Sequence, residues 1–282
     1  MAELLKGSPV AAAISEDLLL RCGNLKNKGI EPCLSILRVG NKADDIAYEN
    51  GAVKRCEKIG IKVIQRVLPA DSPKEMILKQ ISEINEDDSI HGCLMFRPLA
   101  DRQAEAEVCA LLDPDKDVDS MTMTSMAGVF AGNNYGYPPC TAEAVIELLD
   151  YYQIPLEGKR VTVIGRSMVI GKPVSMLLQK RNATVTMCHT RTVDMSAICR
   201  DAEIIVSAAG HAGIVDESYV SSGQIIVDVG INVDPDGNLC GDVKFDEVSK
   251  IVKAITPVPG GVGSVTTAAL CKHVIMSAEK KL

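Results

Sequence analysis

Tryptophan is absent from this sequence of 282 residues, and aromatic residues make up only 3% of it. So few rings leave little surface for base stacking, and the net charge of -7 disfavours a nucleic-acid partner. No apolar run reaches the ~18 residues that a membrane-spanning helix requires. The N-terminus also lacks a charged start followed by an apolar core. We therefore expect no nucleic-acid partner, no membrane partner and a cytoplasmic location.

The ten cysteines form no C-x-x-C pair, and the four histidines have no metal-ligand spacing. Most of the cysteines lie in apolar surroundings, where a free thiol behaves as a small hydrophobic group. We expect reduced, structural thiols in a reducing compartment, and no bound metal.

Helical and strand patterns alternate in the first half of the chain, which predicts parallel strands joined by helical crossovers. A helix with a capping box formed by Ser72 and Glu75 is expected at 72–84. The segment 113–140 is rich in Asp, Gly, Asn and Pro, and we expect a substrate loop and a passage between lobes there. The other predicted elements of this half are helices at 9–25 and 44–59 and strands at 33–39, 61–68 and 90–96.

A second α/β series follows from Thr141, which is expected to cap a helix that ends near Tyr152. Strands are predicted at 161–165, 183–188, 204–209, 224–229 and 254–258. One helix is predicted between the first and second of these strands and another between the second and third. A last helix, 266–280, is expected to pack on the first lobe. The fold class is thus α/β with two α/β lobes: residues 1–140, joined by the C-terminal helix 266–282, and residues 141–265.

The strongest mechanistic signal is VTVIGRSMVIGKP at 161–173. A buried strand ends at Gly165, a tight loop follows, and Gly171 begins a helix. Such a loop lets backbone N–H groups and a helix N-terminus contact a phosphate. The spacing is G-x-S-x-x-x-G and not G-x-G-x-x-G, so glycines that only turn the chain remain an alternative.

The residues after the next strand favour NADP over NAD. NAD sites usually place an acidic residue here to accept from the ribose 2′-hydroxyl. This sequence has His189, Thr190 and Arg191, and Arg166 is expected on the same side. Two guanidinium groups and a hydroxyl suit a 2′-phosphate, which a carboxylate would repel. A solvated surface charge is the alternative for Arg191.

Over nearly its whole length the chain resembles the methylenetetrahydrofolate dehydrogenase/cyclohydrolase family. KDVD and PVPGGVG are the most specific of the shared motifs. The residues that carry the resemblance are VGNKADDIAYENGAVKRCEKIGI (39–61), DPDKDVDSM (113–121), PPCT (138–141), VIGRSMVIGKP (163–173), DVGIN (228–232), GDV (241–243) and TPVPGGVGSVT (256–266).

The resemblance implies a folate-binding N-terminal lobe, a Rossmann-like NADP lobe, a cleft between them and a homodimer in one-carbon metabolism, which supplies purine biosynthesis. It makes Tyr48, which would stack on the folate ring, and Asp119, which would grip the pterin, the catalytic and substrate-binding candidates. The further implied substrate contacts are Pro259, Gly260, Gly261 and Gly263. The implied cofactor contacts are Gly165, Arg166, Ser167, Gly171, Thr190, Arg191 and Ile231.

The sequence departs from the family pattern at two polar positions. The family has Y-x-x-x-K, but Ala52 stands four residues after Tyr48. The next lysine, Lys54, is about 200° further round the helix and is expected to point away from the cleft. The family's Q-L-P-L reads Phe96-Arg97-Pro98-Leu99 here, so Phe96 replaces the glutamine.

These two changes predict a dehydrogenase that has lost most cyclohydrolase activity. Hydride transfer needs mainly alignment of the folate carbon with the nicotinamide. Hydrolysis of the methenyl group needs water to attack and protons to move, which Ala52 and Phe96 cannot assist. A separate cyclohydrolase would then take the methenyl product.

Three alternatives remain open. A fully bifunctional enzyme could use Lys54 or an ordered water. A non-catalytic NADP-binding protein would explain the missing lysine, although the KDVD and glycine motifs disfavour it. A different two-lobe dehydrogenase, acting on amino acids or shikimate, would need a catalytic Lys/Asp pair that the first lobe does not clearly offer.

Overall fold

The computed structural model describes all 282 residues, and the chain divides into two compact units. Unit 1 contains residues 1–12 and 141–266, and unit 2 contains residues 13–140 and 267–282. Each unit has a parallel sheet with helices, which confirms the predicted two-lobe α/β class. None of the helices is both long and apolar enough to cross a lipid bilayer.

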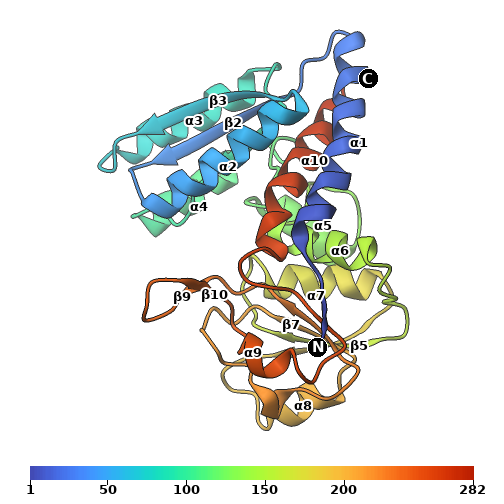
Figure 1. The fold of residues 1–282 in the computed structure, drawn as a ribbon. Coiled ribbons are helices and arrows are strands. Elements are labelled where there is room, and N and C mark those ends of the chain that lie inside the picture. Colours follow the sequence, from blue (N-terminus) through green and yellow to red (C-terminus); the bar gives the residue numbers. More distant parts are fainter. The chain divides into compact units, whose positions relative to one another are not determined.

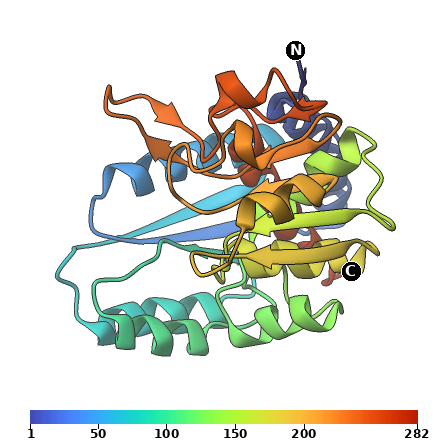
Figure 2. The ribbon, with the colours of Figure 1, turned by 90° about the horizontal axis from the view of Figure 1, so that it is seen from below.

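Unit 2 is built on a three-stranded parallel sheet in the order β3-β2-β4. The central strand β2 is buried along almost its whole length, as its apolar sequence predicts. Figures 1 and 2 show α2 on one face of this sheet and α3 and α4 on the other. The strands are β2 (Cys33–Val39), β3 (Lys62–Leu68) and β4 (Gly92–Met95).

The helices of unit 2 enclose two apolar clusters, one of which joins α2 to the C-terminal helix α10 through Cys56 and Cys271. The ten cysteines are all free thiols, and most of them are buried. The helices are α1 (Gly7–Asn27), within which the division between the units falls, α2 (Ala43–Ile59), α3 (Lys74–Glu86), α4 (Arg102–Leu111), α5 (Met123–Ala131) and α10 (Thr266–Glu279).

Unit 1 is built on a six-stranded parallel sheet in the order β1-β11-β8-β7-β5-β6. Figure 1 shows its strands β5 and β7 between α7 on one side and α8 and α9 on the other. The strands are β1 (Glu3–Leu4), β5 (Arg160–Ile164), β6 (Thr184–Cys188), β7 (Ile204–Ser207), β8 (Ile225–Asp228) and β11 (Ala254–Ile255), with a small antiparallel hairpin of β9 (Asn232–Val233) and β10 (Leu239–Cys240). The helices are α6 (Cys140–Tyr151), α7 (Gly171–Lys180), α8 (Met195–Asp201) and α9 (Phe245–Val248), with 3₁₀ turns η1 (Glu217–Tyr219) and η2 (Val262–Ser264).

Two local expectations were wrong. The N-cap residue of α3 is Pro73, which makes no side-chain cap, and the hydroxyl of Ser72 has no hydrogen-bond partner. The segment 113–140 is not only loop, because it contains helix α5, whose N-cap Thr122 accepts from the backbone N–H of Ser125 at 3.1 Å. A Thr-x-x-Ser start satisfies one of the free N–H groups of the first turn.

Candidate active site

The segment Lys116–Asp119 lies beside β4 in unit 2. Cys93 of β4 and Asp117 form a parallel bridge, and the Cys93 N–H donates to the carbonyl of Lys116 at 2.7 Å. The segment therefore continues the sheet for one residue pair before it turns away. Asp119 follows two residues later.

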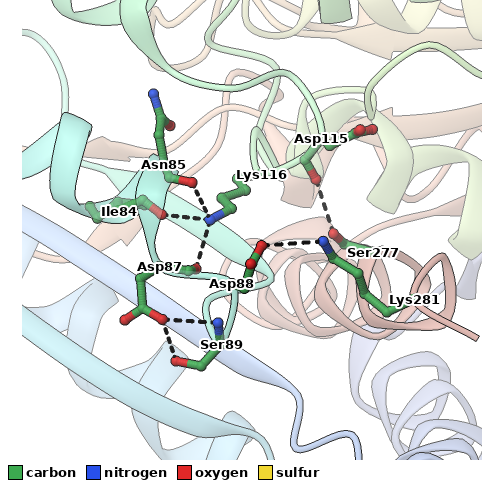
Figure 3. Close-up of polar contacts among 9 residues, drawn as sticks. All are labelled: Ile84, Asn85, Asp87, Asp88, Ser89, Asp115, Lys116, Ser277 and Lys281. Carbon is green, nitrogen blue, oxygen red and sulfur yellow. Dashed lines mark hydrogen bonds and ion pairs between the residues drawn. The ribbon is translucent and has the colours of Figure 1, made fainter.

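Lys116 anchors this segment to the end of helix α3. Its ammonium donates to the carbonyls of Ile84, Asn85 and Asp87 at 2.6, 2.9 and 2.7 Å, as Figure 3 shows. The residue is only 6% exposed. The carbonyls of Ile84 and Asn85 belong to the last turn of α3, where a helix leaves carbonyls without partners, and the carbonyl of Asp87 also accepts from the N–H of Ile90 at 3.0 Å. The resemblance assigned no role to Lys116, and the sequence has no local signal for this contact.

The two aspartates of the segment have different tasks. Asp117 is fully buried, and its carboxylate accepts from the N–H groups of Met121 and Thr122 at 2.8 Å each, which holds the turn into α5. Asp119 is half-buried, and its Oδ1 accepts from the N–H of Cys140 at 2.9 Å. Burial raises the pKa of Asp119, and the Cys140 contact opposes that rise.

Tyr48 and Phe96 are brought together from separate elements of unit 2. Tyr48 lies on α2 and Phe96 directly after β4; their ring centroids are 6.0 Å apart at an interplanar angle of 82°. Both half-buried rings pack against the same apolar cluster. Ala52, one turn after Tyr48, belongs to that cluster and has no exposed surface, whereas Lys54 is exposed. The two positions beside Tyr48 therefore carry apolar side chains, Ala52 and Phe96.

A buried ion pair holds helix α2 at the residue next to Tyr48. Glu49 is 2% exposed, and its carboxylate accepts from Arg38 Nε at 2.5 Å and from Gln65 Nε2 at 2.8 Å. Arg38 also donates to the carbonyl of Gly40 and, at 2.9 Å, to Asn41 Oδ1. The network connects β2, β3 and the start of α2. Sequence reasoning missed it because the partners lie on three different elements.

The glycine loop of unit 1 has the tight geometry that its sequence predicts. Gly165 has φ 124°, and a Cβ there would lie 2.2 Å from the carbonyl oxygen of Ala208. A Cβ on Gly171 would lie 2.3 Å from the carbonyl oxygen of Gly165. Only glycine fits either place. The hydroxyl of Ser167 accepts from the N–H of Ile170 at 3.1 Å and, more weakly, from that of Gly171 at 3.4 Å, at the start of α7.

The basic residues of unit 1 emerge at the same edge of the sheet as this loop. Ile164 and Cys188 are paired at the carboxyl ends of β5 and β6, and the Gly165 N–H donates to the Cys188 carbonyl at 2.9 Å. Arg166, Thr190 and Arg191 follow directly and are all exposed. Neither arginine forms an ion pair with a carboxylate of the chain. Their charge is free to meet an anion.

The second glycine loop and Ile231 line one cavity of unit 1. The cavity measures about 240 Å³ and is lined by 228–231, Leu239 and 257–264, which include Pro259, Gly260, Gly261 and Gly263. Ile231 is 69% exposed. The sequence motifs thus bring an expected folate-contacting loop and an expected cofactor contact to one place.

Two buried aspartates brace the loops around this cavity. Asp228 accepts from the N–H groups of Gly230, Asp242 and Val243. Asp242 accepts from Ser207 Oγ, from the N–H groups of 209–211 and from Asn232 Nδ2. Burial raises the pKa of Asp228 to about 6. The DVGIN and GDV motifs are therefore bracing elements, a role that the sequence did not indicate.

Comparisons with known proteins agree with these two units. The sequence profile of the tetrahydrofolate dehydrogenase/cyclohydrolase catalytic domain matches residues 5–119, and that of the NAD(P)-binding domain of the same family matches residues 139–282. The bifunctional protein FolD of Carboxydothermus hydrogenoformans is 53% identical over 281 residues, which cover 99% of this chain and 98% of that protein.

Solved structures give the same result. The bifunctional FolD enzyme of Campylobacter jejuni is 38% identical with a TM-score of 0.96, and the match covers all of both chains. The Trypanosoma brucei methylenetetrahydrofolate dehydrogenase-cyclohydrolase, solved with an NADP cofactor and an inhibitor, is 33% identical with a TM-score of 0.93. That match covers 99% of this chain and 98% of the other.

Proposed function

The chain belongs to the tetrahydrofolate dehydrogenase/cyclohydrolase family, and from this premise we propose that it is an NADP-dependent 5,10-methylenetetrahydrofolate dehydrogenase with little or no cyclohydrolase activity. The reaction transfers a hydride from the methylene carbon of the folate to the nicotinamide of NADP. The observation that carries the proposal is that two apolar side chains, Ala52 and Phe96, lie beside Tyr48 in a chain that otherwise retains the family's motifs.

Tyr48 and Asp119 are the proposed folate-binding and catalytic residues of unit 2. The Tyr48 ring offers a face on which the pterin can stack. Asp119 is a carboxylate, which accepts well from the ring N–H and amino group of a pterin. The hydrogen bond from the Cys140 N–H to Asp119 and the hydrogen bonds of Lys116 hold this segment in place, so they favour orientation of the folate carbon. Pro259, Gly260, Gly261 and Gly263 of unit 1 are proposed as further folate contacts, as the family resemblance implies.

The cofactor site is proposed at the glycine loop of unit 1. A backbone without Cβ atoms at Gly165 and Gly171 and the start of α7 suit a phosphate. Arg166 and Arg191 lack carboxylate partners, and with Ser167 and Thr190 they suit the 2′-phosphate of NADP. Ile231 is exposed at a braced loop and is proposed as an apolar contact of the cofactor. NADP supplies the hydride acceptor when it is bound.

Loss of the cyclohydrolase is proposed because the positions of the family's lysine and glutamine carry the apolar side chains Ala52 and Phe96. Ala52 has no exposed surface and no polar atom on its side chain, and Phe96 presents a hydrocarbon ring. Lys54 is exposed on α2, about 200° away from Ala52. General acid–base assistance contributes ~10²–10⁴-fold to such reactions, so its absence would leave hydrolysis near the rate in buffer. The methenyl product would then pass to a separate cyclohydrolase.

The test uses the whole chain and two separate assays. Methylenetetrahydrofolate with NADP+ should give NADPH, and omission of the folate should abolish it. Methenyltetrahydrofolate supplied directly should hydrolyse no faster than in buffer. Absence of NADPH would favour a non-catalytic NADP-binding protein, and clear acceleration of hydrolysis would favour the bifunctional alternative.

We further propose that the enzyme is a homodimer and that it works in a reducing, cytoplasmic compartment. The dimer is implied by the family. The location is supported by the ten free cysteines, since free thiols and an absence of disulfides are typical of proteins in reducing compartments.

A further inference from the structure

The C-terminal helix α10 contacts the segment that carries the KDVD motif through polar side chains one turn apart. Ser277 Oγ donates to the backbone carbonyl of Asp115 at 2.9 Å (Figure 3). One turn earlier, His273 Nδ1 lies 2.9 Å from the carbonyl oxygen of Val118. Helix α10 therefore holds the segment at two points, and the second is the peptide that leads into Asp119.

The imidazole of His273 is the donor in its hydrogen bond with Val118. A carbonyl oxygen can only accept, so Nδ1 of this ring carries a proton. His273 is 1% exposed, and its ring stacks on that of the buried Tyr137, with centroids 5.1 Å apart and an interplanar angle of 29°. Burial and stacking restrict rotation of the imidazole. Its N–H group is therefore held in one direction, toward the backbone of the segment.

The peptide between Val118 and Asp119 is held together with the Asp119 carboxylate. The Val118 carbonyl also accepts from the thiol of Cys140, with Sγ at 3.3 Å, and the Cys140 N–H donates to Asp119 Oδ1 at 2.9 Å. A peptide unit is planar, so the direction of its carbonyl fixes the direction of the next Cα atom. A change in the hydrogen bonds of the Val118 carbonyl would therefore move the carboxylate of Asp119.

We propose that His273 is a positioning residue for the folate, which holds the Asp119 carboxylate in place through the carbonyl of Val118. This inference rests on the proposed function, since it assumes that Asp119 binds the pterin. His273 is buried and donates to the backbone, so it contributes to affinity and orientation and takes no part in proton transfer. None of the motifs that carry the family resemblance contains His273.

The first test compares two variants that differ in one hydrogen-bond donor. His273→Asn has an amide N–H at the same distance from Cβ as Nδ1 of the imidazole, whereas His273→Leu branches at the same atom and has no donor. The dissociation constant for tetrahydrofolate, titrated in the presence of NADP, should rise about tenfold in the leucine variant, because the Val118 carbonyl loses its nitrogen donor. The asparagine variant should recover most of this loss. The affinity for NADP should not change in either variant.

The same two substitutions at Met276 are the matched control. Met276 lies on α10 and is 38% exposed. Met276→Leu and Met276→Asn differ in helix propensity as the His273 variants do, but they leave the Val118 carbonyl unchanged. Both should bind tetrahydrofolate as the wild type does. His273→Phe, which keeps a ring against Tyr137 and has no donor, replaces the leucine variant if a thermal melt shows that the latter does not fold.

A double-variant cycle separates an effect on Asp119 from general damage to the fold. If His273 acts through Asp119, His273→Leu should weaken tetrahydrofolate binding in the wild type and have little further effect in an Asp119→Asn background. Equal weakening in both backgrounds would overturn the inference, because the loss would then be independent of the Asp119 carboxylate.

The outcomes distinguish this inference from the proposed function. Suppose that the wild type makes NADPH and that Asp119→Asn weakens tetrahydrofolate binding. Equal affinities of His273→Asn and His273→Leu would then refute the role of His273 alone. An Asp119→Asn variant that binds tetrahydrofolate as tightly as the wild type would instead refute the proposed role of Asp119, on which the inference rests.

Discussion

At the residue scale, the proposed loss of the cyclohydrolase rests on Ala52 and Phe96. Ala52 is fully buried in the apolar cluster, and Phe96 stands edge-on to Tyr48. Neither side chain has a polar atom. The surrounding backbone elements are those of the family, so the proposal requires a change of side-chain chemistry and no change of fold.

Restoring both polar groups should restore hydrolysis. Ala52→Lys combined with Phe96→Gln should raise the hydrolysis of methenyltetrahydrofolate at least tenfold above the rate in buffer, within the ~10²–10⁴-fold range of acid–base catalysis. The assay follows loss of the methenyl compound, with a thermal melt to confirm folding, since a lysine enters an apolar site. Lys54→Ala in the wild type is the control, and it should change nothing. A folded double variant that stays at the buffer rate would speak against the account.

Arg191 should set the preference between the two nicotinamide cofactors. Arg191→Ser removes a charged donor at the proposed 2′-phosphate, so the KM for NADP should rise roughly tenfold while the KM for NAD changes little. Arg160→Ser is the control, because Arg160 is also an exposed arginine but lies at the amino end of β5. A similar loss for both cofactors in Arg191→Ser would argue against contact with the phosphate.

At the element scale, the three hydrogen bonds of Lys116 connect the end of helix α3 to the segment that carries Asp119. Lys116 donates to the buried carbonyl of Ile84, to the part-buried carbonyl of Asn85 and to that of Asp87, which also accepts from the Ile90 N–H (Figure 3). Lys116→Met should lower the free energy of unfolding by about 2–4 kcal/mol, because unsatisfied buried groups cost more than a hydrogen bond gains. It should also raise the folate KM through displacement of Asp119.

Denaturant unfolding of Lys116→Met and of a control variant, alongside folate and NADP kinetics, tests this prediction. Lys79→Met is the matched control, since Lys79 lies on α3 with a side chain that is 74% exposed. Its stability should stay within about 0.5 kcal/mol of the wild type. Equal stability of Lys116→Met and Lys79→Met would show that the carbonyls are satisfied in another way.

The helices and strands with a clear apolar period could be predicted from the sequence. Features that depend on which of two neighbouring residues caps a helix, or on a helix flanked by loop-like residues, could not. The strand at 33–39 and the end of α2 at Ile59, before a left-handed Gly60, are where the sequence places them. The capping box at Ser72 failed because Pro73 is the N-cap, which moved the helix start past the serine. Helix α5 was missed because its glycine and asparagine neighbours resemble loop residues.

At the scale of the whole molecule, long-range pairing decides which residues belong to which unit. Strand β1 pairs with β11, so residues 1–12 belong to unit 1, although the sequence pattern placed them in the first lobe. The contact is only two residue pairs long and has no periodic signal. The same limit explains why Arg38, Glu49 and Gln65 were not expected to meet: a buried charge network is set by three elements at once.

In unit 1, the glycine loop of the proposed cofactor site could be predicted from the sequence, whereas the hydrogen bonds that brace the neighbouring loops could not. Gly165, Gly171 and Arg166 are where the loop motif predicts, since backbone geometry alone requires the glycines. The bracing of the loops by Asp228 and Asp242 depends on six backbone N–H groups and two side chains from separate segments, and no spacing rule indicates such an arrangement.

The most direct test of the account is the ratio of the two products in one vessel. Methylenetetrahydrofolate and NADP+ are mixed with the enzyme, and NADPH and methenyltetrahydrofolate are followed together. The account predicts that methenyltetrahydrofolate accumulates in step with NADPH and then decays only at its rate in buffer. NADPH formed with 10-formyltetrahydrofolate, and without accumulation of the methenyl compound, would contradict it.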